Sequence, residues 1–120
     1  MLAQRYPDVY DGIAALAPAI NWNRILSSLY WAQFVMNLAG EYPEPCELNA
    51  ITMAAILACD AHNGVVDSLI SNIENCHFDP FSIVDTSFNC SRVKKQILQA
   101  AAIVANATWA GPQSLNSTSL

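Results

Sequence analysis

The sequence predicts a partial α/β protein, in which one core strand is followed by a mainly helical, loop-rich segment. An apolar run with the length of a strand buried on both faces lies between the turn signal Asp11-Gly12 and Pro18. A small-residue helical turn is the alternative there. Later segments repeat apolar residues at helical spacing. Because such a strand needs a parallel sheet covered by helices, which 120 residues do not obviously supply, we expect a fragment of a larger fold.

The composition excludes several classes of protein. Hydrophobic residues make up 53% and charged residues 12%, which excludes disorder for most of the chain. The net charge is −5 and no basic block could neutralise phosphates, so no nucleic-acid partner is expected. No apolar run reaches the ~18 residues of a membrane span, so no membrane partner is expected either.

Proline and glycine delimit the first elements. Tyr6-Pro7 is typical of a helix end, since proline disfavours helical backbone in the residue before it. The core strand is predicted within the apolar run Tyr10–Ala19. A helix is predicted after Asn21 or Asn23, either of which is a good N-cap, and it ends at Gly40. The apolar stripe of this helix comprises Ile25, Leu29, Ala32 and Met36, widened by Leu26, Tyr30 and Trp31.

Two more helices are predicted after a proline-stiffened linker over 41–46. One ends at Cys59, and a loop is predicted from Asp60 to Asn89. The next begins with Ser91 as its N-cap and is broken at Gly111-Pro112. Their apolar positions are Leu48, Ile51, Ala55 and Ala58 in the first, and Val93, Ile97, Ala100 and Val104 in the second.

Cysteines and glycosylation sequons indicate an extracellular protein. The start of the chain lacks the features of a secretory signal. However, four cysteines in a short chain are typical of a disulfide framework, and three Asn-x-Ser/Thr acceptors are present. The acceptors are Asn89, Asn106 and Asn116.

Common catalytic motifs are absent from the sequence. It has no Gly-x-Ser-x-Gly elbow, no phosphate-cradling glycine loop, no Cys-x-x-Cys and no His-Glu-x-x-His. Nothing places a nucleophile beside a base and an orienting acid. The chain alone is therefore not expected to be a complete enzyme.

The segment from Cys59 to Ile70 is a candidate cation loop. It combines two carboxylates, an amide oxygen and Gly64, and calcium prefers six to eight such hard oxygens. The spacing differs from that of an EF-hand. The alternative is an Asx-rich turn whose side chains cap their own backbone.

Zinc is the competing metal for this region. Its ligands would be Cys59, His62, Cys76 and His77, but adjacent Cys76 and His77 cannot easily serve one tetrahedral ion. The extracellular signals favour a Cys59–Cys76 disulfide instead.

Aromatic residues gather on the first long helix, and they are Trp22, Tyr30, Trp31 and Phe34. Burial against a neighbouring element is favoured over binding of a sugar or phenol.

The chain begins with the run Met1-Leu2-Ala3-Gln4-Arg5-Tyr6-Pro7-Asp8-Val9-Tyr10-Asp11-Gly12-Ile13-Ala14-Ala15-Leu16-Ala17-Pro18-Ala19. This run resembles one of the form Leu-Met-x-Ala-Gln-Arg-Tyr-Pro-x-x-Tyr-Asp-Gly-Ile-x-Ala-x-Ala-Pro-Ala. That form is typical of the tannase and feruloyl esterase family of secreted α/β-hydrolases. Leu16 replaces the usual glycine. Further landmarks in family order are Pro45-Cys46-Glu47-Leu48, Phe78-Asp79-Pro80 and Ala107-Thr108-Trp109-Ala110-Gly111-Pro112.

The resemblance implies a division of the chain. Residues 1–20 would hold the end of the helix behind the catalytic serine and the next sheet strand of an α/β-hydrolase, with the strand over Asp11–Ala17. Residues 21–120 would be part of an inserted lid domain with a calcium loop. The serine would fall just before this chain, and the acid and histidine after it.

The resemblance also implies a calcium site and one disulfide. Side-chain ligands would be Asp60, Asn63 and Asp67, with backbone carbonyls from Val65 and Leu69. Asn63 replaces an aspartate and Ser68 a glycine, so calcium should bind more weakly. The implied disulfide is Cys59–Cys76, and a bridge between Cys46 and Cys90 is only a guess.

The implied function is hydrolysis of esters of aromatic acids, such as gallate or ferulate, by a serine, histidine and aspartate outside this chain. The lid would cover the acyl pocket, and no turnover is expected from the chain alone. The alternatives are a stand-alone calcium-binding or carbohydrate-adhesion module and a truncated gene product without function.

Overall fold

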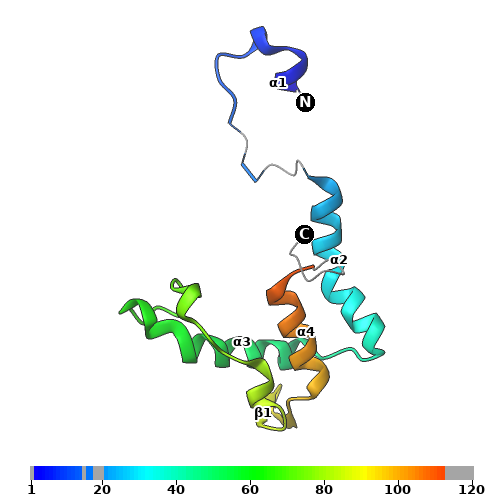
Figure 1. Cartoon of the computed structure of the whole chain (residues 1–120), viewed down its shortest axis with the longest axis vertical. Helices are drawn as coiled ribbons and strands as arrows, with labels where there is room; N and C mark the ends of the chain where they lie inside the picture. Colours follow the sequence, from blue (N-terminus) through cyan, green and yellow to red (C-terminus); the bar gives the residue numbers. More distant parts are fainter. Residues whose placement is uncertain (1, 15, 18–20, 113–120) are drawn as a thin grey trace.

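Three helices longer than ten residues dominate the part of the chain that the structure describes. This computed structural model describes residues 2–14, 16–17 and 21–112. The helices are α2 (Trp22–Ala39), α3 (Pro45–Cys59) and α4 (Gln99–Ala110). Figure 1 shows α2 and α4 side by side, α3 crossing near α4, and α1 (Leu2–Arg5) at the far end from β1. The shorter elements are the 3-10 turns η1 (Pro7–Val9), η2 (Asp60–Asn63), η3 (Ile73–Asn75) and η4 (Pro80–Ile83), and strands β1 (Ser87–Cys90) and β2 (Val93–Gln96).

Helix α2 begins and ends where the sequence predicts. Asn21 is its N-cap residue, and Gly40 follows it in the left-handed conformation with φ +67°. Glycine adopts this conformation without the steric cost that a Cβ atom brings. One face packs on α4, where the indole N–H of Trp31 donates a hydrogen bond to the Ala107 carbonyl at 2.8 Å. The predicted stripe is half-buried at Ile25, Ala32 and Met36, whereas Leu29 is exposed.

Helix α3 is fixed at its start by a capping box. Glu44 caps the helix, its side chain accepts from the Glu47 N–H, and the Glu47 carboxylate accepts from the Glu44 N–H. Pro45 occupies the first helical position, where no donor is lost. Ile51 and Ala55 are buried as predicted, but the helix turns Cys59 rather than Ala58 toward the core.

The predicted helix beginning at Ser91 is wrong at its start. Strands β1 and β2 form an antiparallel hairpin there, with Cys90 opposite Val93 and Ser91-Arg92 at the turn. Both turn residues have positive φ, +49° and +75°, as a tight two-residue hairpin turn requires. Helix α4 starts only at Gln99, and its predicted apolar positions Ala100 and Val104 are buried. The predicted loop before it likewise contains η2, η3, η4 and most of β1.

A small core joins α3, α4, η4 and the hairpin. Its buried members are Ile51, Ile97, Ala101 and Ala105. Half-buried side chains pack around them, and these are Leu48, Ala50, Phe78, Ile83 and Phe88. Alanines on α4 allow α3 and α4 to approach closely at this core.

The predicted core strand over Asp11–Ala17 is not formed in the described residues of that segment. The backbone bends at Asp11, Leu16 and Ala17, and Ala17 has a φ of +47°. Ile13 and Leu16 are 59% and 95% exposed. A strand buried on both faces requires sheet neighbours, and the sheet in the described part of the chain is the β1–β2 hairpin alone.

The chain is more extended than a compact domain of its length. Its radius of gyration is 19.1 Å, against about 14 Å expected for 120 residues from the usual scaling. Among the described helices, none combines the length and apolar character needed to span a bilayer.

Candidate functional site

The candidate cation loop leaves the end of α3 and is closed by a disulfide. Cys59 is buried at the last position of α3 and is bonded to Cys76. The chain then forms η2 and turns at Gly64, which has a φ of +84°. Ser68 also has a positive φ, +66°. The crosslink joins residues 17 apart, and loops of this length are stabilised by about 3 kcal/mol in the chain-entropy model.

Asp60 anchors this loop. Its side chain is buried, with the residue only 7% exposed. One carboxylate oxygen accepts from the Asp67 N–H at 3.1 Å, and the other accepts from the Ser68 N–H at 3.0 Å. Both bonds come from neutral backbone groups. The far side of the loop is thus folded back onto one buried negative charge.

Asn63 and Asp67 form local Asx turns. The Asn63 side-chain oxygen accepts from the Val65 N–H at 2.9 Å, and Asp67 Oδ1 accepts from the Leu69 N–H at 3.1 Å. These bonds match the Asx-rich alternative that the sequence left open. Each oxygen keeps a second lone pair, so the turns and a bound cation are chemically compatible.

The zinc alternative is wrong for the structure. The thiolates that zinc would need from Cys59 and Cys76 are bonded to each other as a disulfide. His62 and His77 nevertheless line one cavity of 420 Å³, together with Asp79 and Ser82.

The polar groups of that cavity are not arranged as a catalytic triad. The Ser82 hydroxyl donates to the Asp79 backbone carbonyl at 2.6 Å, and the Asp79 carboxylate caps η4 by accepting from the Phe81 N–H at 2.9 Å. In the described part of the chain, no hydrogen bond joins either histidine side chain to a serine or a carboxylate.

An apolar cavity of 370 Å³ lies on the other side of the same disulfide. It is an open hollow lined by α3, the segment 70–78 and the end of α4, with Ile56, Ile70, Phe78 and Trp109 among its lining residues. Phe78 and Trp109 meet edge to face, with ring centroids 6.3 Å apart.

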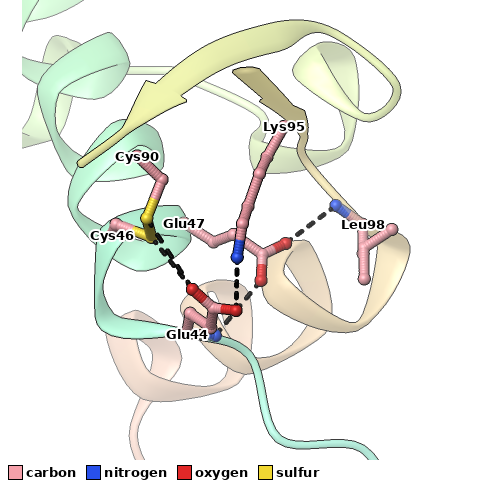
Figure 2. A network of polar contacts seen from close by, with 6 residues as sticks. All are labelled: Glu44, Cys46, Glu47, Cys90, Lys95 and Leu98. Carbon is pink, nitrogen blue, oxygen red and sulfur yellow. Dashed lines mark hydrogen bonds and ion pairs between the residues drawn. A yellow bond between two sulfur atoms is a disulfide. The ribbon is translucent and has the colours of Figure 1, made fainter. Parts of the chain in front are cut away.

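A second disulfide, Cys46–Cys90, joins the start of α3 to the end of β1 and confirms the guessed pairing. Beside it, Glu44 forms an ion pair with Lys95. Figure 2 shows the Glu44 carboxylate between Lys95 and the disulfide sulfurs, which it contacts at 3.5 and 3.7 Å. The structure describes no free cysteine. Because both sulfurs are oxidised, this cluster of Glu44 and two cysteines lacks the thiolates that a metal would bind.

Glu47 is the residue of this region that sequence reasoning missed. It is 5% exposed, and Figure 2 shows its carboxylate reaching both the Glu44 N–H and the Leu98 N–H. The second bond, at 3.2 Å, ties the entry of α4 to the first turn of α3. The pair Glu44 and Glu47, three positions apart at a helix start, is the local signal that could have indicated half of this network.

Two of the three predicted glycosylation acceptors lie in the described residues. Asn89 is exposed on β1, and Asn106 is exposed on α4. Asn116 lies outside the described residues.

The expected burial of the aromatic residues on α2 is wrong for three of the four. Trp22, Tyr30 and Phe34 are 65%, 53% and 41% exposed, whereas Trp31 is half-buried. Within the described part of the chain, the main partner of α2 is α4, which covers one side of it.

Comparisons with known proteins agree on one group of enzymes. A family model described as "Tannase and feruloyl esterase" matches residues 1–119. A protein named "Probable feruloyl esterase" from Arthroderma benhamiae is 42% identical over 112 residues, which are 93% of this chain and 21% of that protein. A protein named "Tannase" from Aspergillus oryzae is 32% identical over 90 residues, 73% of this chain and 15% of that protein.

A solved structure gives the same result. The tannin acyl hydrolase from Aspergillus niger superimposes with a TM-score of 0.78 and 27% sequence identity, over 99% of this chain and 23% of that one. The chain therefore spans about a fifth of the length of the proteins it matches.

Proposed function

Because this chain belongs to the tannase and feruloyl esterase family, we propose that it is part of a secreted carboxylic ester hydrolase acting on esters of aromatic acids such as gallate or ferulate. The observation that carries the proposal is the family match over residues 1–119. The two disulfides add support for secretion, since such crosslinks persist in oxidising compartments.

The reaction would use a serine, a histidine and an aspartate that lie outside this chain. The serine attacks the ester carbonyl, the histidine takes and returns the proton, and the aspartate orients the histidine. Backbone N–H groups hold the oxyanion that forms. In the proposal, the serine precedes Met1, and the other two residues follow the chain.

Residues 21–120 would form part of the lid over the acyl pocket, and residues 1–20 would belong to the hydrolase domain. The exposed apolar side chains on α2 support this role, because monomeric proteins rarely leave large apolar patches in water. They include Trp22, Leu26, Leu29 and Tyr30. Disulfides at both ends of α3 would hold the lid in shape while it covers substrate.

Calcium would bind in the lid through Asp60, Asn63 and Asp67, with the carbonyls of Val65 and Leu69. The donor set fits a hard cation, and within the described residues the hydrogen-bond partners of the buried Asp60 carboxylate are neutral backbone N–H groups. When bound, the ion would stabilise the loop and take no part in ester chemistry. Calcium binding would be weaker than with an aspartate at position 63, because Asn63 supplies an oxygen without a negative charge.

An ester assay tests the proposal. Methyl ferulate and methyl gallate are offered to the complete protein that contains this chain, and to the 120-residue chain alone. We expect release of the aromatic acid by the complete protein and none above the blank by the chain. An inert complete protein that still gains thermal stability with calcium would favour the calcium-binding module over the enzyme.

A further inference from the structure

The sequon Asn89-Cys90-Ser91 shares a residue with the Cys46–Cys90 disulfide. Its first residue is exposed on β1, its second is buried and crosslinked, and its third lies in the hairpin turn. Modification of Asn89 and oxidation of Cys90 therefore affect adjacent residues of one sequon.

We propose that Asn89 carries an N-linked glycan, and that closure of the Cys46–Cys90 disulfide ends the period in which the glycan can be attached. This inference rests on the proposed secretion and is independent of the proposed ester hydrolysis. In the step, the Asn89 amide nitrogen bonds to the anomeric carbon of a lipid-diphosphate-linked oligosaccharide. The bond from that carbon to the diphosphate oxygen breaks, the lipid diphosphate leaves with the electron pair, and the amide releases one proton.

In the folded hairpin the Asn89 side chain is exposed to solvent, but its backbone is fixed by strand pairing. Asn89 pairs with Lys94 across the hairpin, and Cys90 pairs with Val93. Cys90 is only 8% exposed. A glycan on the exposed side of β1 would project into solvent without disturbing the core, so the product is compatible with the fold. An enzyme that must enclose all three sequon residues needs the hairpin to open.

The turn itself favours opening until the disulfide forms. Ser91 and Arg92 both have positive φ without being glycine, and this conformation costs roughly 1–2 kcal/mol for such a residue. Isolated two-stranded hairpins are marginal in water. The Cys46–Cys90 bond ties the last residue of β1 to the first turn of α3 and removes this freedom.

Because the hairpin forms much faster than the disulfide, disulfide formation determines how long the sequon stays accessible. A hairpin forms in about 1–10 μs, whereas a disulfide takes seconds to hours. The hairpin therefore opens and closes many times before Cys90 is oxidised, and the sequon is accessible during this period. Asn106 provides the contrast, because its sequon lies on α4 and contains no cysteine.

The test expresses the complete protein that contains this chain, behind a secretion signal, in a eukaryotic host. Three forms are compared, namely the unaltered chain, Cys46→Ser, and the double variant Cys59→Ser with Cys76→Ser. Cys46→Ser leaves all three sequon residues unchanged, and the double variant removes a disulfide while keeping Cys90 bridged. Total cellular and secreted protein is deglycosylated enzymatically, which converts each occupied asparagine to aspartate, and is then read by peptide mass spectrometry. Occupancy is thus measured whether or not a variant folds.

We expect Asn89 to be partly occupied in the unaltered chain. In Cys46→Ser, the unmodified fraction at Asn89, relative to that at Asn106, should fall at least about twofold because disulfide closure no longer competes. The double variant should match the unaltered chain. An Asn89 that stays unmodified in all forms would overturn the site. Three results would overturn the role of the disulfide. The first is full occupancy of Asn89 in the unaltered chain, and the second is an unmodified fraction in Cys46→Ser equal to that of the unaltered chain. The third is a fall in the double variant as large as that in Cys46→Ser.

Discussion

Asp60 shows how a single buried residue organises a loop. Its carboxylate receives two backbone N–H groups from seven and eight residues further along the chain. A carboxylate is rarely buried unless its charge is compensated. Here the compensation consists of backbone dipoles, and a cation on the free lone pairs would add to it.

Calcium should stabilise the chain through Asp67 more than through Asn63. In the oxidised chain, calcium should raise the melting temperature. Asp67→Ala should lose most of this rise because a charged ligand is removed, and Asn63→Ala should lose less. Thermal unfolding with calcium and with EDTA measures the effect, and Asp8→Ala, an exposed acid on η1, is the control. Melting temperatures unaffected by calcium in the unaltered chain would contradict the site and leave the Asx turns as the whole explanation of the loop.

Glu47 should be worth more to stability than any exposed acid of the chain. Glu47→Ala leaves the Glu44 and Leu98 N–H groups without their acceptor, and we expect a loss of about 2–3 kcal/mol in the free energy of unfolding. Urea unfolding followed by circular dichroism measures it. Glu41→Ala is the matched control and should change stability by less than about 0.5 kcal/mol. Equal effects of the two substitutions would show that the Glu47 bonds are not significant.

At the scale of elements, the β1–β2 hairpin carries strain that one substitution relieves. Arg92 has a φ of +75°, and none of the hydrogen bonds or ion pairs of the described residues involves its side chain. Arg92→Gly should raise stability by about 0.5–1 kcal/mol, because glycine adopts this conformation without the steric cost. The control Lys94→Gly, on the extended strand β2, should lower stability. If thermal unfolding shows lower stability for both variants, the result would argue against a positive-φ turn at this position.

Helix α2 should be joined to α4 mainly through Trp31. Trp31→Phe removes the N–H that bonds to Ala107, and we expect a loss of about 1 kcal/mol together with faster amide exchange along α2. Trp22→Phe serves as the control, since Trp22 is 65% exposed and no hydrogen bond of its side chain is present in the described part of the chain. Hydrogen exchange read by mass spectrometry separates the two variants. Identical exchange in α2 for both would contradict the contact.

Elements that depend on local patterns could be predicted from the sequence, and those that depend on distant partners could not. Helices α2 and α3 repeat apolar residues at helical spacing, and Asn21 and Gly40 mark the ends of α2, so both helices were predicted closely. The hairpin was missed because Ser91-Arg92 lacks the Asn-Gly chemistry that usually marks such a turn. The strand over Asp11–Ala17 depends on sheet neighbours that the described residues do not include.

The candidate site follows the same division. Asp60, Asn63 and Asp67 were identified because they lie close in sequence, and their hydrogen bonds remain within one loop. The contact between Glu47 and Leu98 joins residues 51 apart, and no periodicity indicates it. The exposure of Trp22 was unpredicted for a related reason, since an amphipathic pattern identifies an apolar face without identifying what covers it.

At the scale of the whole molecule, the chain is a well-crosslinked helical unit with an extended beginning. Disulfides hold both ends of α3, while the described residues before α2 make few contacts with the rest. Large apolar side chains remain exposed on α2 and in the segment before it, among them Trp22, Leu26, Leu29 and Leu16. This distribution agrees with a unit that covers a larger hydrolase, as proposed.

Labelling of the reactive serine tests the central claim most directly. The complete protein that contains this chain is treated with a fluorophosphonate, which bonds covalently to the activated serine of an esterase, and the modified residue is identified by peptide mass spectrometry. We predict one labelled serine outside residues 1–120, with loss of methyl ferulate or methyl gallate hydrolysis in proportion to labelling. A label on a serine within residues 1–120, or hydrolysis that persists in fully labelled protein, would contradict the account.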